Sequence, residues 1–331
     1  MSRRATIAIA TGDPAGIGPE ISLKAALDPA VRAVCDPVLV SDPAVIARHA
    51  KACGIEADIR VIAHMADADF SDGKLNVHDC RQPEAATLAF GATSPMAGRA
   101  SIAFVGTAVK AALAGEVDAV IGAPHNETSI AQAGIKFDGH PSFVARETGT
   151  PEDDVFMMLC FGGTRIAHCT LHQSVRSAID AITKERVLKV LRVTHRALKN
   201  LGIAKPRIAV SGINPHAGEG GLFGREEIEI VKPAMDAAAV EGMETAGPFG
   251  ADIMFHMKGY DAFVVMLHDQ GHVAAKFAAP NATIALTIGT PILFSSVAHG
   301  SAHDIAGKGV ASPAAMIEAI LNLAGARQPR T

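Results

Sequence analysis

The sequence predicts an α/β fold with a largely parallel sheet, and three observations support that prediction. Short apolar runs typical of buried strands alternate with segments of helical periodicity. Hydrophobic residues make up 49% of the chain, so it can bury a large core and is not disordered. At 331 residues, two domains are expected rather than one. No internal repeat or low-complexity linker marks the boundary between them.

The elements are expected in the following order. A buried strand over residues 5–10 leads through a glycine-rich turn to a helix that begins near Pro19, because proline suits the first helical position. Further strands are predicted over 117–122, 155–160, 165–170, 206–211 and 262–267. Helices are predicted over 100–114, 184–201, 226–240 and 313–324.

Charge and composition exclude several classes of protein. The net charge is −4 with no long basic run, which argues against a nucleic-acid or membrane-surface protein. Residues 277–302 lack charged side chains, but prolines and hydroxyl residues interrupt them, so two buried strands fit better than a membrane span. The apolar stretch after Arg4 is too short for the core of a signal peptide. Five scattered cysteines without a CxxC pair indicate a reduced, cytoplasmic protein.

Four histidines directly follow predicted strands: His125, His172, His216 and His268. Ligands of open α/β sheets bind outside the carboxyl ends of the strands, so these imidazoles could converge on one metal ion. Three imidazoles with an open position describe a catalytic centre for Zn²⁺ or a similar ion. The spacing leaves open which three of the four meet. Any one of them alone is more often a polar loop residue, but the set of four favours a site.

The surroundings of two of these histidines add candidates. His216 lies in the glycine-rich loop 214–221, and His268 is followed directly by Asp269. Asp269 could orient a ligand, act as a general acid or base, or cap a helix. Lys276 lies one or two helical turns further on and could face the same site, although a surface position is the default for a lysine.

The glycine-rich turn over residues 12–20 is a second candidate. Its spacing matches neither the GxGxxG dinucleotide motif nor a P-loop. We expect a tight turn whose backbone approaches another group closely, with a purely structural turn as the alternative.

The strings Thr11–Glu20, Asn214–Gly221, His268–Gly271 and His299–Ala302 together resemble the 4-hydroxythreonine-4-phosphate dehydrogenase family over nearly the whole chain. Residues 299–309 also resemble the NAD-adenosine loop of isopropylmalate and isocitrate dehydrogenases. The resemblance implies their fold, with two α/β/α domains around a cleft. One domain would comprise residues 1–125 plus about 290–331, and the other about 126–289. It also implies a homodimer with an active site shared between protomers.

The resemblance further implies roles for individual residues. The metal ligands would be His172, His216 and His268. The substrate-binding residues would be His140 and Lys276, with Phe294 and Ala285 at two further substrate positions. The cofactor-binding residues would be Gly12, Asp13, Gly16, Gly18, His299, Gly300, Ser301, Ala302, Asp304 and Ile305. Lys276 and Asp269 are the candidates for proton handling.

Three positions depart from the family pattern. A substrate threonine is Pro141 here, a substrate asparagine is Ala285, and a substrate arginine is Phe294. Arginine is a strong phosphate partner that phenylalanine cannot replace. A branch of the family, the terephthalate dihydrodiol dehydrogenases, is more similar here. It shares the patterns at Pro124–Thr128, Gly134–Phe137, Leu171–Ala178 and Met266–His272. Its substrate is a cyclic cis-diol carboxylate, and an apolar residue beside a ring suits such a substrate.

The resulting hypothesis is a metal-dependent dehydrogenase of a β-hydroxy carboxylate that uses NAD or NADP and loses CO₂ after oxidation. Zn²⁺, Co²⁺, Mn²⁺ and Mg²⁺ are all compatible with the ligand set. Two alternatives stay open. Within the family, the substrate could be 4-phosphohydroxy-L-threonine or 4-phospho-D-threonate or -erythronate. In another class, a metal-dependent hydrolase would use the same histidines but would not need the loop at 299–309.

Overall fold

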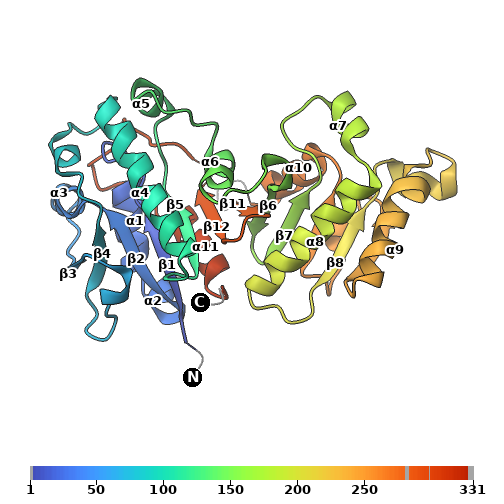
Figure 1. Ribbon diagram of the computed structural model, residues 1–331, viewed down its shortest axis with the longest axis horizontal. Helices are drawn as coiled ribbons and strands as arrows, with labels where there is room; N and C mark the ends of the chain where they lie inside the picture. Colours follow the sequence, from blue (N-terminus) through green and yellow to red (C-terminus); the bar gives the residue numbers. More distant parts are fainter. Residues whose placement is uncertain (1–2, 280–282, 298, 327–331) are drawn as a thin grey trace. The chain divides into compact units, whose positions relative to one another are not determined.

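The computed structural model describes residues 3–279, 283–297 and 299–326. The chain forms two compact units. Unit 1 comprises residues 1–152 and 290–331, and unit 2 comprises residues 153–289. The predicted α/β class is confirmed, because each unit contains strands flanked by helices (Figure 1).

Six strands of unit 1 lie in the order β3-β4-β2-β1-β5-β12, and their pairings are parallel. Their bounds are β1 (Ala5–Ala10), β2 (Cys35–Ser41), β3 (Ile59–Ile62), β4 (Leu75–Asp79), β5 (Ala119–Gly122) and β12 (Phe294–Val297). Strands β1 and β5 are almost entirely buried, as expected of parallel strands with helices on both faces.

The helices of unit 1 are α1 (Gly18–Leu27), α2 (Pro29–Val34), α3 (Pro43–Cys53), α4 (Pro95–Leu113), α5 (Glu127–Gln132), α6 (His140–Glu147) and α11 (Ala314–Leu323), with short 3₁₀ turns η1 (Met65–Asp67) and η2 (Pro83–Thr87). Helix α4 begins earlier than predicted, because Ser94 caps it by accepting a hydrogen bond from the Ala97 amide. Helices α5 and α6 pack on α4. Residues 126–152, which the sequence assigned to the second domain, therefore lie in unit 1.

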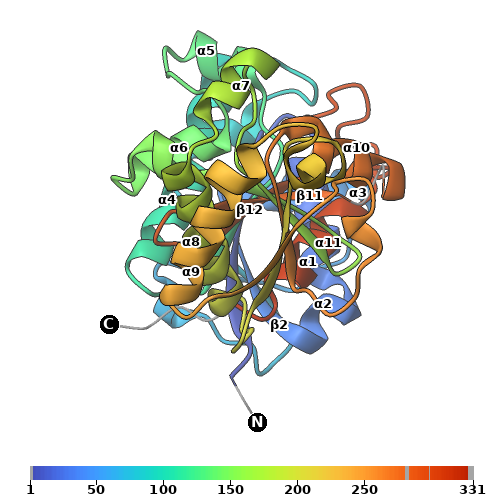
Figure 2. The same cartoon turned by 90° about the vertical axis from the view of Figure 1, so that its right-hand side faces the viewer.

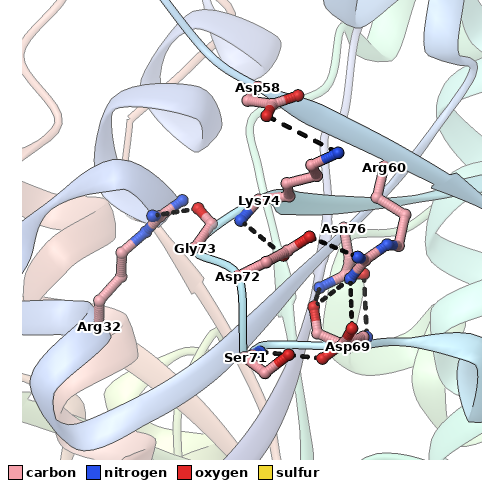
Figure 3. Close-up of polar contacts among 9 residues, drawn as sticks. All are labelled: Arg32, Asp58, Arg60, Asp69, Ser71, Asp72, Gly73, Lys74 and Asn76. Carbon is pink, nitrogen blue, oxygen red and sulfur yellow. Dashed lines mark hydrogen bonds and ion pairs between the residues drawn. The ribbon is translucent and has the colours of Figure 1, made fainter.

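A polar network closes the connection between β3 and β4 at the edge of this sheet (Figure 3). Arg60 pairs with Asp69 and Asp72, and the Asn76 side chain donates to the Asp69 carbonyl. The Arg32 guanidinium donates to the Gly73 carbonyl. Each of these charged side chains has a partner within the network, so the cluster stabilises the loop and offers no free charge to a ligand.

The strands of unit 2 lie in the order β11-β6-β7-β10-β8-β9. Their bounds are β6 (Phe156–Phe161), β7 (Thr164–His168), β8 (Arg207–Ser211), β9 (Glu244–Phe249), β10 (Ala262–Val265) and β11 (Ile284–Ile288). The expectation of a largely parallel sheet fails at β6, which is antiparallel to both β11 and β7. The reason is a two-residue hairpin at Gly162-Gly163, where both glycines have positive φ.

The helices of unit 2 are α7 (Val175–Ala181), α8 (Lys184–Asn200), α9 (Lys232–Val240) and α10 (His268–Ala278). Short helical turns are η3 (Glu152–Asp154), η4 (Pro215–Gly221), η5 (Glu227–Val231) and η6 (Met254–His256). Helices α8 and α9 lie side by side over the strands (Figure 2). The helix predicted over 226–240 is a π-helical turn, η5, that continues into α9.

Residues 277–302 contain the two predicted strands, β11 and β12. Among the described residues, no helix has both the length and the apolar character needed to cross a membrane.

Candidate active site

Three of the four strand-end histidines follow neighbouring parallel strands. Strand β10 pairs with β7 on one side and with β8 on the other. His172, His268 and His216 follow β7, β10 and β8, so the topology delivers all three to the carboxyl edge of unit 2. His125 follows β5 in unit 1 instead.

His172 and His268 line one cavity of about 320 Å³. Their ring centroids lie 5.6 Å apart, and metal–nitrogen bonds of about 2.0–2.1 Å would let both rings reach one ion. The Nδ1 atom of His268 donates to the Asp269 carboxylate over 2.7 Å. Because a carboxylate only accepts, Nε2 of His268 keeps its lone pair free for a ligand bond. This pair of imidazoles therefore fits a metal ion, and Asp269 acts through His268.

His216 does not join this cavity. Its side chain is 65% exposed, and its Nδ1 atom lies 3.6 Å from the Glu219 carboxylate. Within the described part of the chain, no group of three or more His, Cys, Asp or Glu side chains is arranged to hold a metal. A single chain thus brings together two of the three predicted ligands.

Helix α10 carries a row of side chains at four-residue spacing: His268, His272 and Lys276. The His272 ring stacks on His268 with a centroid distance of 3.7 Å and an interplanar angle of 9°. Burial and, to a smaller extent, the neighbouring His268 lower the pKa of His272. Sequence reasoning missed His272, although its spacing from His268 was the signal that could have found it.

A second cavity of about 460 Å³ lies in unit 1. Its lining joins predicted substrate and cofactor residues: Pro124, His125, Asn126, Glu127, His140, Val297, His299, Gly300 and Ser301. The imidazoles of His125 and His140 meet edge to face at 4.6 Å. Burial and, to a smaller extent, the neighbouring His125 lower the pKa of His140 to about 3. His140 is therefore neutral at physiological pH and can offer a hydrogen bond without a charge.

Two predicted substrate residues have other surroundings. Phe294 is fully buried in the core of unit 1, where its ring packs 5.2 Å from His140. Phe294 packs against the imidazole and is not among the residues that line the cavity in unit 1, and its assignment as a substrate-binding residue stays a prediction. Ala285 lies on β11 in unit 2 and lines neither of the two cavities.

The glycine-rich turn and the loop at 299–309 contact each other directly. The Ile17 amide donates to the Ser301 carbonyl over 2.9 Å, and His303 Nε2 pairs with the buried Asp13 carboxylate over 2.6 Å. A Cβ added at Gly16 would lie 2.8 Å from Ser301 atoms. Further along, Lys24 donates to the Gly309 and Ala311 carbonyls.

These contacts change the interpretation of the turn. The close approach that Gly12, Gly16 and Gly18 permit is to the chain itself, at Pro124, Ser301 and Thr11. The turn therefore positions the loop. A Cβ added at Gly300 would meet nothing within 4 Å, so the backbone there is open for a cofactor to approach. Ala302, beside it, has a positive φ of 40°. Asp304 and Ile305 follow in the same loop, with Asp304 exposed.

The fold and these cavities define an α/β enzyme with histidines at the carboxyl ends of its strands. Residues 33–323 match the sequence profile described as pyridoxal phosphate biosynthetic protein PdxA, and the chain belongs to this family. A 1,2-dihydroxy-3,5-cyclohexadiene-1,4-dicarboxylate dehydrogenase from Comamonas sp. is 41% identical over 321 residues, which cover 95% of each chain. A relative from Cutibacterium acnes, provisionally named a D-threonate 4-phosphate dehydrogenase, is 39% identical over 97% of this chain and 93% of its own.

Solved structures agree with this membership. A 4-hydroxythreonine-4-phosphate dehydrogenase from Burkholderia phymatum has a TM-score of 0.91 and 36% identity, and the match covers 99% of this chain and all (100%) of that one. A terephthalate 1,2-cis-dihydrodiol dehydrogenase from Burkholderia xenovorans LB400 has a TM-score of 0.78 and 41% identity over 98% of each chain.

Proposed function

We propose that this chain is an NAD(P)-linked, metal-dependent dehydrogenase of a non-phosphorylated cyclic cis-dihydrodiol carboxylate. The observation that carries the substrate class is the absence of cationic side chains from both histidine-lined cavities. No Arg or Lys is present among the described residues that line them. A phosphate dianion would find no Arg or Lys to pair with there, whereas the single charge of a carboxylate can be met by the proposed metal ion and by neutral donors such as His140.

His172 and His268 would hold the metal in the cavity of unit 2, with Asp269 fixing the His268 ring. Such an ion supplies Lewis acidity toward a hydroxyl oxygen. Asp269 is 86% exposed and already paired, so we assign it a positioning role and leave proton handling to Lys276. His140 would hold a hydroxyl or carboxylate oxygen of the substrate by a neutral hydrogen bond.

The reaction we propose balances as follows. The substrate hydroxyl loses its proton to a base, and hydride from the same carbon reduces NAD(P)⁺. The resulting β-keto acid loses its carboxylate as CO₂, and the electron pair of the broken bond forms an enolate. Protonation of the enolate oxygen gives an aromatic diol.

We propose that the cofactor binds at the loop 299–309, including Gly300, in unit 1. We also propose that the two units are the two α/β/α domains of an isocitrate/isopropylmalate dehydrogenase-like fold, and that the protein is a homodimer whose partner supplies the third imidazole, His216. The odd number and scattered positions of the five cysteines support a reducing, cytoplasmic setting.

Initial rates of nicotinamide reduction test this proposal. The metal-loaded protein is given a cis-dihydrodiol carboxylate or 4-phospho-D-threonate, each with NAD or NADP. We expect turnover of the dihydrodiol, loss of that turnover in EDTA, and recovery with Zn²⁺, Co²⁺, Mn²⁺ or Mg²⁺. Turnover of the phosphorylated acid alone would contradict the substrate class. Hydrolysis without nicotinamide reduction would instead support a metal-dependent hydrolase.

A further inference from the structure

The loop that carries His216 has an unusual backbone. Five consecutive residues, from His216 to Gly220, have positive φ between 44° and 80°. Three of them, His216, Ala217 and Glu219, are not glycine. The left-handed conformation is unfavourable for residues with a Cβ atom, so this turn needs support from its surroundings.

A buried carboxylate supplies that support. Glu227, at the start of η5, is 4% exposed. One of its oxygens accepts from the Ile213 and Asn214 amides over 2.7 and 2.8 Å, and the other accepts from the Asn214 side chain over 3.0 Å. Glu227 thereby fixes both residues immediately before Pro215, the residue from which the chain enters the left-handed turn.

The turn is also built to admit this carboxylate. A Cβ at Gly218 would lie 2.6 Å from Oε2 of Glu227, and one at Gly212 would lie 2.8 Å from Oε1. Only glycine at these two positions lets the carboxylate sit against the turn without displacement. The backbone around the turn therefore encloses the Glu227 carboxylate. None of the hydrogen bonds described for this carboxylate involves a proposed metal ligand.

We propose that Glu227 is a positioning residue that holds the left-handed turn and so presents the His216 imidazole for metal binding. The inference rests on the proposed function of His216 as a metal ligand. Glu227 acts on the ion indirectly, through the backbone that carries His216. Groups that orient a ligand in this indirect way typically contribute about 10- to 100-fold to metal affinity.

Co²⁺ titration, followed by the visible spectrum of the bound ion, tests the proposal with four variants of the full-length protein. Glu227→Gln removes the charge. Gly218→Ala keeps the glutamate in the sequence but moves its carboxylate away from the turn. Glu229→Gln, an exposed carboxylate on the same helical turn, is the matched control. Ala217→Gly, combined with Glu227→Gln, removes the Cβ that makes one left-handed residue unfavourable.

We expect E227Q and G218A to weaken Co²⁺ binding by about 10- to 100-fold and to change its spectrum, with E229Q unchanged. Adding A217G to E227Q should recover part of the affinity, because glycine adopts the left-handed conformation at residue 217 without strain. If E227Q fails to fold, G218A decides the question. Wild-type affinity and spectrum in both variants would overturn the inference but leave the proposed metal site intact. Failure of the wild-type protein to bind Co²⁺ would overturn both.

Discussion

At the scale of single residues, the chemistry of the candidate site depends on which nitrogen of each imidazole carries the proton. The Asp269 carboxylate can only accept a hydrogen bond, so it fixes the proton of His268 on Nδ1. The His272 ring then covers one face of His268. Together they restrict both the tautomer and the orientation of a proposed ligand before any ion arrives.

This arrangement predicts the effect of Asp269→Asn. The amide can present its NH₂ group to His268, which removes the bias toward the Nδ1-protonated tautomer. We expect Co²⁺ or Zn²⁺ affinity to fall by about 10- to 100-fold, measured by competition with a chromogenic chelator. Asp180→Asn, an exposed aspartate on α7, is the control. Equal affinity in D269N and wild type would mean that Asp269 does not orient His268.

A second residue-scale prediction concerns the dependence of stability on pH. His49 is fully buried and Nε2 donates to the Pro14 carbonyl, while no described group partners Nδ1. Burial lowers the pKa of His49 to about 4 from 6.5. Between these two values the unfolded chain binds a proton that the folded chain does not. The free energy of unfolding therefore falls as the pH drops through this window, by about 1.4 kcal/mol per pH unit for this histidine.

The variant His49→Gln keeps a donor for Pro14 but cannot titrate. The variant is compared with wild type by urea unfolding at pH 7.5, 6.5 and 5.5, which lie within about one unit of the ordinary histidine pKa. We expect the acid-induced loss of stability to be smaller in H49Q, whereas substitution of the exposed His256 should leave the slope as in wild type. Identical slopes in H49Q and wild type would mean that His49 binds its proton equally in the folded and unfolded chain, so that burial does not lower its pKa.

At the scale of elements, the turn before α1 and the loop at 299–309 behave as one structure. Three features of the turn and of α1 hold the loop: the Ile17 amide, the Asp13 carboxylate and the Lys24 ammonium group. Glu20, which is fully buried, pairs with Lys24 and also accepts from the Ala311 amide. The proposed cofactor loop is therefore fixed at both ends before a nucleotide binds.

His303→Ala tests whether this fixation matters. Loss of its bond to the buried Asp13 carboxylate frees the centre of the loop and leaves that carboxylate short of a partner. A hydrogen bond to a charged group contributes about 1.5–3 kcal/mol, so we expect binding of NADH to weaken by at least about tenfold. Fluorescence titration of NADH measures this, with Val310→Ala, an exposed residue directly after the loop, as control. Unchanged affinity in H303A would mean that the loop holds its conformation without the pair.

The elements also show what could be predicted from sequence. Strands such as β1 and β8 are apolar runs whose positions could be predicted, and the loop after β8 carries one of the four strand-end histidines. The left-handed turn at His216–Gly220 could not be predicted, because three of its five residues disfavour positive φ and their support comes from Glu227. The role of Gly16 could not be predicted either, because a glycine-rich turn has the same sequence pattern whether a ligand or Ser301 lies against it.

At the scale of the whole molecule, the third proposed metal ligand and the exposed apolar surface both bear on whether two copies of the chain associate. Val273 and Phe277, four residues apart on α10, are 65% and 92% exposed. The same helix begins at His268, so an apolar pair lies on the element that carries a proposed metal ligand. Burying a phenylalanine side chain contributes about 1.5–3 kcal/mol, and a second copy of this chain would provide such burial at both symmetric positions.

Phe277→Ser therefore tests the proposed homodimer and the shared site together. We expect wild-type protein to be a dimer and F277S to be largely monomeric, as measured by light scattering coupled to size exclusion. Val240→Ser, 90% exposed on α9, is the matched control and should remain dimeric. If the partner contributes the third imidazole, monomeric F277S also loses Co²⁺ affinity, although Phe277 binds no metal. A monomer that binds Co²⁺ as tightly as the wild-type protein would contradict the shared site, because one chain would then supply all three imidazoles.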